Sequence, residues 1–521
     1  MSHPEDPRSR TERLALLAAY AVAGLCLLPG FTDQINPDGV SYLASARKYL
    51  AGDFAAAATA FWSPLYTWLL AVPLGLGVPA LLSAKLVDLL SGAAALLGTW
   101  RLLSALRVDR ALRMGAAATA IPVLLGFGLS VATPDLLACA IVLHLLADLA
   151  GEEWWTLPHA GPRAGLLMAA AYLAKAYALG FVAVHFALVL ALDLWRTPAE
   201  RSRIARRAAV ALAALLLVVG GWACLLGLKY GRPLVSAAGT LSWGLDGPGN
   251  PGYPMQRDGF LPLPDATAQS AWDDPTLLHL PSWNALGSPG ERAHFRALVS
   301  RNLAELAAIA LHFSPLAGVV AVLTVLLAGS HRDPPPRRHA AILALAALVL
   351  PAGYLVLHLR ERFLSTLCVL LLALGTFAVG ALRSWLDGDR RWRGSLAAAL
   401  LFLSFLAAPI GALRASWGDG RQWAEMARAL EAAPAGSLVA SNGRWRQSLY
   451  LSFHRGWRYL GEPGPNAPPK QVKEELWRQR AAFFLVWGDG PQPPFLSTWE
   501  EVARAPGAAR LYRVPLVTAS P

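Results

Sequence analysis

Charged side chains are scarce in this sequence. Asp, Glu, Lys and Arg together make up 15% of its 521 residues, whereas a soluble domain usually carries about 25%. Cysteine is also rare, and none of the four cysteines belongs to a C-x-x-C pair. The first shortage argues against a soluble domain and the second against a zinc site or a disulfide framework.

The short motifs of several enzyme classes are missing as well. The sequence contains no H-E-x-x-H, P-loop or G-x-S-x-G motif. Its net charge of +12 invites a nucleic-acid interpretation. However, Lys and Arg lie mostly in short segments between apolar runs, which is topology information rather than a phosphate-binding face. We therefore expect no nucleic-acid partner.

Hydrophobic residues, by contrast, make up 55% of the chain, and its mean hydropathy is +0.41. Many apolar runs approach the ~20 residues that cross a bilayer. The sequence therefore predicts an α-helical polytopic membrane protein with about 11 transmembrane helices. The expected spans are Leu14–Pro29, Pro79–Trp100, Leu112–Leu129, Asp135–Ala150, Ala164–Ala174, Tyr177–Leu194, Ala208–Leu228, Leu303–Ala328, Ala340–Leu357, Phe363–Leu382 and Ser395–Leu413.

The distribution of Lys and Arg sets the expected orientation, because short cytoplasmic loops are rich in both. The Arg-rich segments 196–207 and 383–393 fall on one side of the membrane when the N-terminus is placed inside. We expect an integral protein of the plasma (inner) membrane with a cytoplasmic N-terminus and an extracytoplasmic C-terminus. The short apolar run 64–77 contains Pro73 and suits an interfacial or re-entrant helix better than a span.

Residues 1–413 form the expected transmembrane domain. Its first outside loop, 31–78, contains a predicted amphipathic helix over Gly39–Leu50, with Arg47 and Lys48 on the polar side. A second long outside loop, 229–302, is rich in Pro, Gly and Trp. Its aromatic residues either lie at the lipid headgroups or stack on sugar rings; they are Trp243, Tyr253, Trp272 and Trp283.

Residues 414–521 have the composition of a soluble protein and alternate strand-like with helix-like segments. This pattern predicts a small extracytoplasmic α/β domain, which we interpret as an acceptor-docking unit or a structural cap. The expected strands are Ser437–Ser441, Trp457–Leu460, Phe483–Trp487 and Arg510–Val514, and the expected helices are Gln422–Ala432, Trp445–Phe453 and Lys470–Arg480.

Two acidic residues fall at the outer membrane boundary. Asp38 follows Pro37 at the start of the first-loop helix, and Asp135 follows Thr133-Pro134 at the start of the fourth span. Each has a structural explanation, since acidic residues cap helices and favour the N-terminal end of the helix dipole. Because both are expected at the same face, they could also serve as a general base and as a metal ligand or substrate positioner.

Four cations are expected at similar depth: Lys85, Lys175, Arg360 and Arg362. Any one of them could simply extend its charge to the interface. Together they could hold a lipid phosphate, for which Arg forks and Lys point charges are well suited.

Five segments, in this order, resemble motifs of one enzyme family, the GT-C-type membrane glycosyltransferases. These enzymes take sugar from a polyprenyl-phosphate lipid at the outer membrane face and include aminoarabinose transferases and protein mannosyltransferases. The first 200 residues carry most of the resemblance. The segments are N-P-D-G-V-S-Y-L-A-S-A-R-K-Y-L-A-G-D-F (Asn36–Phe54), S-P-L-Y-T-W-L-L (Ser63–Leu70), A-T-P-D-L-L (Ala132–Leu137), L-A-K-A-Y (Leu173–Tyr177) and R-E-R-F-L (Arg360–Leu364).

The resemblance implies an enzyme that transfers a hexose or pentose from a polyprenyl-phosphate donor to a hydroxyl acceptor on a glycan, lipid or protein, with inversion. It implies Asp38 as the catalytic base and Asp135 as the second acidic site. It implies substrate contacts from Lys175, Lys85, Arg362, Arg360 and Tyr42. A divalent cation, Mg²⁺ or Mn²⁺, is a further expectation, although Gly39 stands where the family often has a second acidic residue.

Two other classes of protein share the expected topology. One is a non-catalytic scaffold or a lipid-linked polymer ligase or polymerase, and the other is a transporter. A secondary transporter or a flippase-like protein for a lipid-linked substrate would also be polytopic, but a transporter should show an internal repeat and ionisable residues at the membrane midplane. No convincing repeat is visible in the sequence. An outward cavity between the first loop and the C-terminal domain would favour the transferase.

Overall fold

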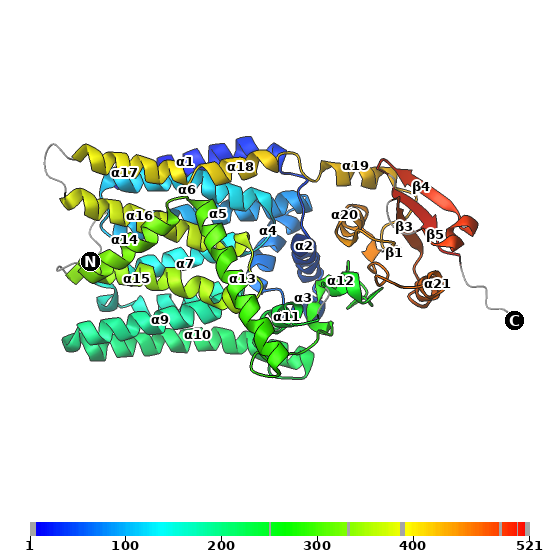
Figure 1. Cartoon of the computed structure of the whole chain (residues 1–521), viewed down its shortest axis with the longest axis horizontal. Coiled ribbons are helices and arrows are strands. Elements are labelled where there is room, and N and C mark those ends of the chain that lie inside the picture. The colour runs from blue at the N-terminus through cyan, green and yellow to red at the C-terminus, as the bar shows by residue number, and fades with distance from the viewer. Residues whose placement is uncertain are drawn as a thin grey trace.

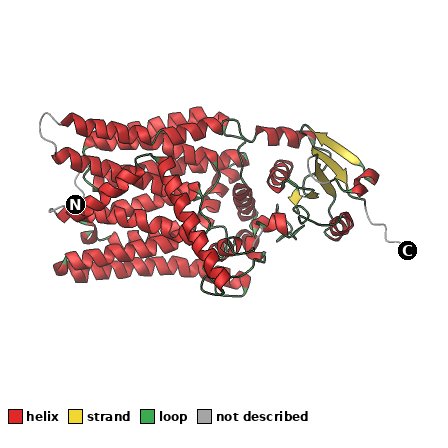
Figure 2. Ribbon diagram, viewed as in Figure 1, coloured by secondary structure: helices red, strands yellow, loops and turns green. Residues whose placement is uncertain are grey.

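The structure is a computed structural model that describes residues 7–249, 252–330, 334–385, 391–488, 492–507 and 509–515. Long helices form a bundle, and a small sheet with its own helices lies beyond one end of that bundle (Figure 1, Figure 2). The predicted fold class, a polytopic helical membrane protein with a small C-terminal α/β unit, is confirmed.

The helices of the bundle lie where the spans were expected, but the number of helices able to cross a membrane differs from the expected number. Eight described helices are long and apolar enough to cross a membrane, or nine if one bent pair counts as a single span. The count of 11 is not confirmed, because two expected spans are short helices of 16 and 15 residues. The bundle consists of α1 (Pro7–Leu27), α5 (Ala80–Ala105), α6 (Arg110–Ser130), α7 (Asp135–Ala150), α8 (Ala160–Ala174), α9 (Tyr177–Arg196), α10 (Arg201–Tyr230), α13 (Pro289–Phe313), α14 (Ala317–Ser330), α15 (Pro334–Ala352), α16 (Ser365–Trp385), α17 (Arg391–Ser404) and α18 (Ala407–Ala415).

The bent pair corrects one expected span. The predicted continuous helix over Leu303–Ala328 is broken between α13 and α14, whose axes differ by 99°. The break falls at Ser314, which precedes Pro315, and a residue before proline is disfavoured in the helical conformation. The hydroxyl of Ser314 caps the next helix by accepting from the amide of Leu316 at 3.1 Å.

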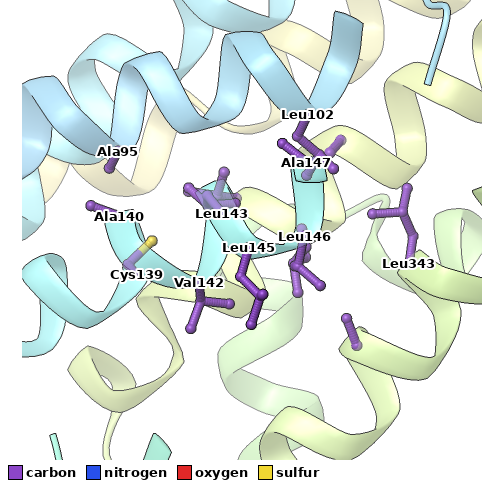
Figure 3. Packing of buried hydrophobic residues seen from close by; sticks show 14 of the residues in the cluster. Ala95, Leu102, Cys139, Ala140, Val142, Leu143, Leu145, Leu146, Ala147 and Leu343 are labelled. Carbon is purple, nitrogen blue, oxygen red and sulfur yellow. The ribbon is translucent and has the colours of Figure 1, made fainter. Parts of the chain in front are cut away.

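Helix α7 lies at the centre of the core. It contacts α5, α8, α15 and α16, and 13 of its 16 residues are buried. Figure 3 shows its apolar side chains directed toward neighbouring helices on several sides. A helix that is apolar all round is buried in this way, so the residue at its start, Asp135, is held in a fixed place.

The first outside loop contains α2 (Pro37–Leu50), α3 (Phe54–Ala57) and α4 (Pro64–Gly75). Helix α2 begins two residues before the predicted start and is buried on more than its apolar side. Lys48, expected on the exposed side, is 5% exposed and pairs with Asp265 at 2.6 Å. The reason is tertiary: the second long loop covers that side of α2 and supplies a buried carboxylate, Asp273, as well.

That second loop is shorter than expected, because α13 already begins at Pro289. A capping box of Ser288 and Glu291 starts the helix. The connection between α10 and α13 contains α11 (Ala238–Leu245) and α12 (Pro254–Arg257).

The C-terminal sheet has five strands in the order β2-β1-β3-β5-β4. β1 pairs in parallel with β2 and β3, whereas β5 pairs antiparallel with β3 and β4. The expected strands and helices are present, and β4 is an additional strand that the sequence analysis missed. The elements are α19 (Arg421–Ala429), β1 (Leu438–Ser441), α20 (Trp445–Arg455), β2 (Arg458–Tyr459), α21 (Pro469–Arg478), β3 (Phe483–Trp487), β4 (Glu501–Ala505) and β5 (Ala509–Arg513).

Candidate active site

A cavity of about 1260 Å³ lies where the helical bundle, the second long loop and the C-terminal domain meet. Helices α2 and α20, which both contribute to its lining, lie between the bundle and the sheet in Figure 1. Six of the seven site residues predicted from the sequence line it: Asp38, Tyr42, Asp135, Lys175, Arg360 and Arg362.

Asp38 lies in the first turn of α2 and points toward a cation rather than toward the helix backbone. Its Oδ2 accepts a hydrogen bond from Arg362, and the indole N–H of Trp272 lies 3.4 Å from its Oδ1. The N-cap position of α2 is Asn36, not Asp38. Helix capping therefore does not account for this carboxylate.

Close packing brings the start of α2 against the connection between α6 and α7. The side chain of Asn36 accepts from the amide of Ala132 at 2.9 Å. A Cβ atom added at Gly39 would lie 2.9 Å from the Cβ of Ala132, which is closer than real Cβ contacts. Glycine after Asp38 thus lets the first loop approach the start of α7, where Asp135 lies.

Asp135 is the more enclosed carboxylate. Lys175 donates to its Oδ1, and the hydroxyl of Thr133 donates to its Oδ2 at 2.8 Å. Arg362, the partner of Asp38, lies 4.0 Å from the same Oδ2. One guanidinium therefore links the two carboxylates, and the side chain of Asp135 is 9% exposed against 21% for Asp38.

Aromatic rings hold Lys175 in place. Its ammonium lies 4.0 Å from the centre of the Phe363 ring and 5.5 Å from that of Tyr354. Tyr177 stacks on Tyr354 with ring centres 3.6 Å apart. The irregular end of α8, the start of α9 and the segment after α15 thus form one unit around this cation.

Tyr42 and Arg360 occupy different parts of the lining. Tyr42 is 4% exposed and packs edge-on against Trp62 and Tyr66. Burial, together with the negative charge of Asp38, raises the pKa of the Tyr42 hydroxyl well above its ordinary value, so this residue stays protonated. Arg360 donates to Nε2 of His358 at 2.7 Å and is exposed.

Lys85, the seventh predicted site residue, does not line the cavity. It is completely buried in α5, and its ammonium donates to the carbonyl of Leu129 at 2.7 Å. The sequence predicted a depth similar to that of Lys175. However, the position of Lys85 around the axis of α5 directs its side chain toward the end of α6.

Other lining residues come from the C-terminal domain, which the sequence analysis did not connect with the site, and from the second long loop. Trp445, Arg446 and Tyr450 belong to α20 in the C-terminal domain, and Tyr253 and Trp272 to the second long loop. The aromatic composition of that loop was the only signal in the sequence. Trp243 and Trp283 instead stack on each other, with ring centres 4.0 Å apart.

The donor set does not suit a divalent cation. Asp38 and Asp135 are the carboxylates in the cavity lining, and both are occupied by Arg362 or Lys175. Within the described ranges there is no group of three or more His, Cys, Asp or Glu side chains that could hold a metal ion.

No family model and no curated protein sequence matches the chain. Solved structures of other proteins do match it. ArnT from Cupriavidus metallidurans bound to undecaprenyl phosphate matches with a TM-score of 0.57 and 15% identity, covering 98% of this chain and 99% of that one. The oligosaccharyltransferase AglB from Archaeoglobus fulgidus, in complex with an inhibitory peptide and a dolichol-phosphate, matches with a TM-score of 0.56 and 11% identity. It covers 91% of this chain and 69% of that chain.

At these identities the likeness establishes the fold. The chain has the fold of two proteins of the GT-C type, and the structural resemblance expected from the five sequence motifs is confirmed at that level. Since the match with ArnT extends over nearly the whole chain, the similarity also includes regions in which no sequence motif was found.

Proposed function

We propose that the protein is a glycosyltransferase that moves a sugar from a polyprenyl-phosphate donor to a hydroxyl acceptor at the outer face of the membrane. The observation that carries this proposal is the cavity, because its lining combines apolar side chains with paired charges. Phe181 and Val184 of α9 and Leu348 and Val349 of α15 are among the apolar ones. Such a lining suits a lipid chain that ends in a charged group.

The fold supports the choice of donor. ArnT was solved with undecaprenyl phosphate and AglB with a dolichol-phosphate, and both share the fold of this chain. Lys175 and Arg362 are the cations best placed for the donor phosphate, with Arg360 close to them in sequence. As the bond to the sugar breaks, negative charge grows on the departing phosphate, and cationic side chains at that position lower the barrier.

Asp38 is the better candidate for the general base. Its side chain is more than twice as exposed as that of Asp135, and among the described residues only a long contact from Trp272 reaches its Oδ1. In the proposed reaction the acceptor hydroxyl gives its proton to Asp38, and the oxygen of that hydroxyl attacks the anomeric carbon of the sugar. Polyprenyl phosphate leaves from the opposite side, so a single displacement inverts that carbon.

The ion pairs suggest how donor binding prepares the base. Arg362 is shared by Asp38 and Asp135. A donor phosphate would compete for this guanidinium, which prefers bidentate contacts with phosphate. Asp38 would then lose its strongest partner at the moment when the donor is in place. Asp135, still paired with Lys175, would keep that lysine in position.

The direct test uses purified protein with a panel of radiolabelled polyprenyl-phosphate sugars and a membrane-lipid extract as acceptor. We expect transfer of label from one donor into an acceptor, or slow release of free sugar to water when no acceptor is present. The release of polyprenyl phosphate should accompany both. A protein that binds these donors and moves them across a vesicle membrane without cleaving them would instead be a transporter. Parallel reactions with EDTA and with Mg²⁺ or Mn²⁺ test metal dependence.

A further inference from the structure

Positive charge exceeds negative charge in the cavity. Its charged lining comprises two carboxylates and four cations, namely Asp38, Asp135, Lys175, Arg360, Arg362 and Arg446. The carboxylates pair with Lys175 and Arg362. Within the described part of the chain, Arg360 and Arg446 have no carboxylate partner. The side chains of the lining therefore carry a net positive charge, which favours the binding of negatively charged ligands.

The two unpaired arginines come from different parts of the molecule. Arg360 lies two residues from Arg362, in the segment that follows α15, and thus belongs to the group of cations assigned to the donor phosphate. Arg446 belongs to α20 of the C-terminal domain. It is exposed, and its guanidinium lies 5.4 Å from the centre of the Trp445 ring.

Helix α20 is held firmly, so the position of Arg446 is fixed by more than its own side chain. Leu449 and Phe453 pack in one apolar cluster with Val40 and Leu43 of α2. At the start of α20 the amide of Trp445 donates to Glu462 at 2.8 Å. The same helix that contacts the one carrying Asp38 therefore presents Arg446 to the cavity.

We propose that Arg446 binds a negatively charged group of the acceptor, and that the acceptor is a hydroxyl compound that carries a phosphate or a carboxylate. This inference rests on the proposed glycosyl transfer. A polyprenyl-phosphate donor carries one phosphate, for which the bundle already supplies Lys175 and Arg362. A guanidinium on a separate element is suited to a second anion, because its fork matches both phosphate and carboxylate.

Binding tests this assignment without turnover. We propose to titrate purified protein with octyl glucuronide and with octyl glucoside, which differ in one carboxylate. A second pair, phosphatidylglycerol and diacylglycerol in detergent micelles, tests in the same way whether a phosphate on a lipid strengthens binding. The intact protein should bind the anionic member of at least one pair about tenfold more tightly, and Arg446→Gln should remove that preference. Which pair responds distinguishes a glycan carboxylate from a lipid phosphate.

Matched variants separate a binding role from a structural one. Arg428→Gln removes an exposed arginine of α19 that does not line the cavity and should keep the preference. Arg446→Lys should restore part of it, and binding of polyprenyl phosphate should be unchanged in Arg446→Gln. Equal affinity for both members of both pairs in the intact protein, or an unchanged preference in Arg446→Gln, would overturn the assignment. Preference for the anion without sugar transfer to any acceptor would leave the anion site standing and reject the proposed function.

Discussion

At the scale of single residues, the arrangement around Arg362 organises the site. One guanidinium contacts two carboxylates that lie nearly a hundred residues apart in the sequence, and Lys175 contacts the more enclosed of them. Pairing of this kind offsets the cost of placing charges at a membrane boundary. It also distinguishes the two acids, because Asp38 is accessible to a substrate hydroxyl and Asp135 is surrounded by its partners.

Replacement of Asp38 by Asn should abolish most of the turnover and leave the fold intact. The amide keeps the size of the side chain but cannot accept the proton, and general base catalysis typically contributes roughly 10²–10⁴-fold in rate. Label transfer from the donor should fall by that factor in Asp38→Asn and much less in Asp135→Asn. Asp33→Asn, in the same loop but outside the cavity lining, is the control. An inactive Asp33→Asn beside a normal Asp38→Asn would move the base to Asp33.

Lys175→Ala should weaken binding of polyprenyl phosphate. A charge-assisted contact to phosphate contributes about 1.5–3 kcal/mol, and the loss should appear in the dissociation constant measured by isothermal titration. Lys470→Ala is the matched control, because that side chain is 90% exposed in the C-terminal domain. Lys175→Arg should recover part of the affinity. Unchanged donor affinity in a folded Lys175→Ala protein would mean that the lysine serves only to pair with Asp135.

At the scale of elements, the sequence predicted those parts of the fold that depend on local patterns. The apolar runs gave helices, and Phe483–Trp487 forms a strand with the predicted bounds. The bend at Ser314 was missed because apolar residues predominate on both sides of it, although Pro315 was a usable signal. Strand β4 was missed because its alternation is weak and its pairing with β5 is irregular.

The candidate site shows the same limit. The sequence supplied six of the lining residues because each lies in a motif near the end of an apolar run. It could not place Arg446 or Trp445, since their role depends on α20 packing against α2, more than 400 residues earlier in the chain. It could not separate Lys85 from Lys175 either, because the direction of a side chain around a helix axis is decided by neighbours.

Close contact between α2 and the α6–α7 connection predicts that Gly39 tolerates no larger residue. Gly39→Ala would place a Cβ 2.9 Å from that of Ala132 and 3.0 Å from Oδ1 of Asn36. Overpacking of this kind typically costs about 1–3 kcal/mol, so thermal stability and turnover should both fall. Gly220→Ala in α10 meets no atom within 4 Å and should leave both unchanged. Normal turnover in Gly39→Ala would show that α2 can shift without moving Asp38 from its working position.

At the scale of the whole molecule, the cavity and the C-terminal sheet lie at the same end of the bundle. α2, α20 and the sheet follow one another at that end in Figure 1, while α10 begins at the other end, within the Arg-rich segment 196–207. Short loops rich in Arg face the cytoplasm. The proposed orientation therefore places the cavity, the acceptor and the C-terminal domain outside, where a lipid-linked sugar would meet them.

Cysteine labelling of intact cells tests this orientation. Cys26 and Cys224, which are exposed on α1 and α10, are first replaced by Ala; Cys139 and Cys368 are buried and can stay. Ser437→Cys, next to β1, should react with a membrane-impermeant maleimide added outside. Ser202→Cys, at the start of α10, should react only after the membrane is opened, because the Arg-rich segment keeps it in the cytoplasm. Each variant should still transfer the radiolabelled sugar, which shows that the protein being labelled with maleimide is folded. Reaction of both cysteines from the same side would reject the topology, and reaction of Ser202→Cys alone from outside would invert it and remove the cavity from the outer face.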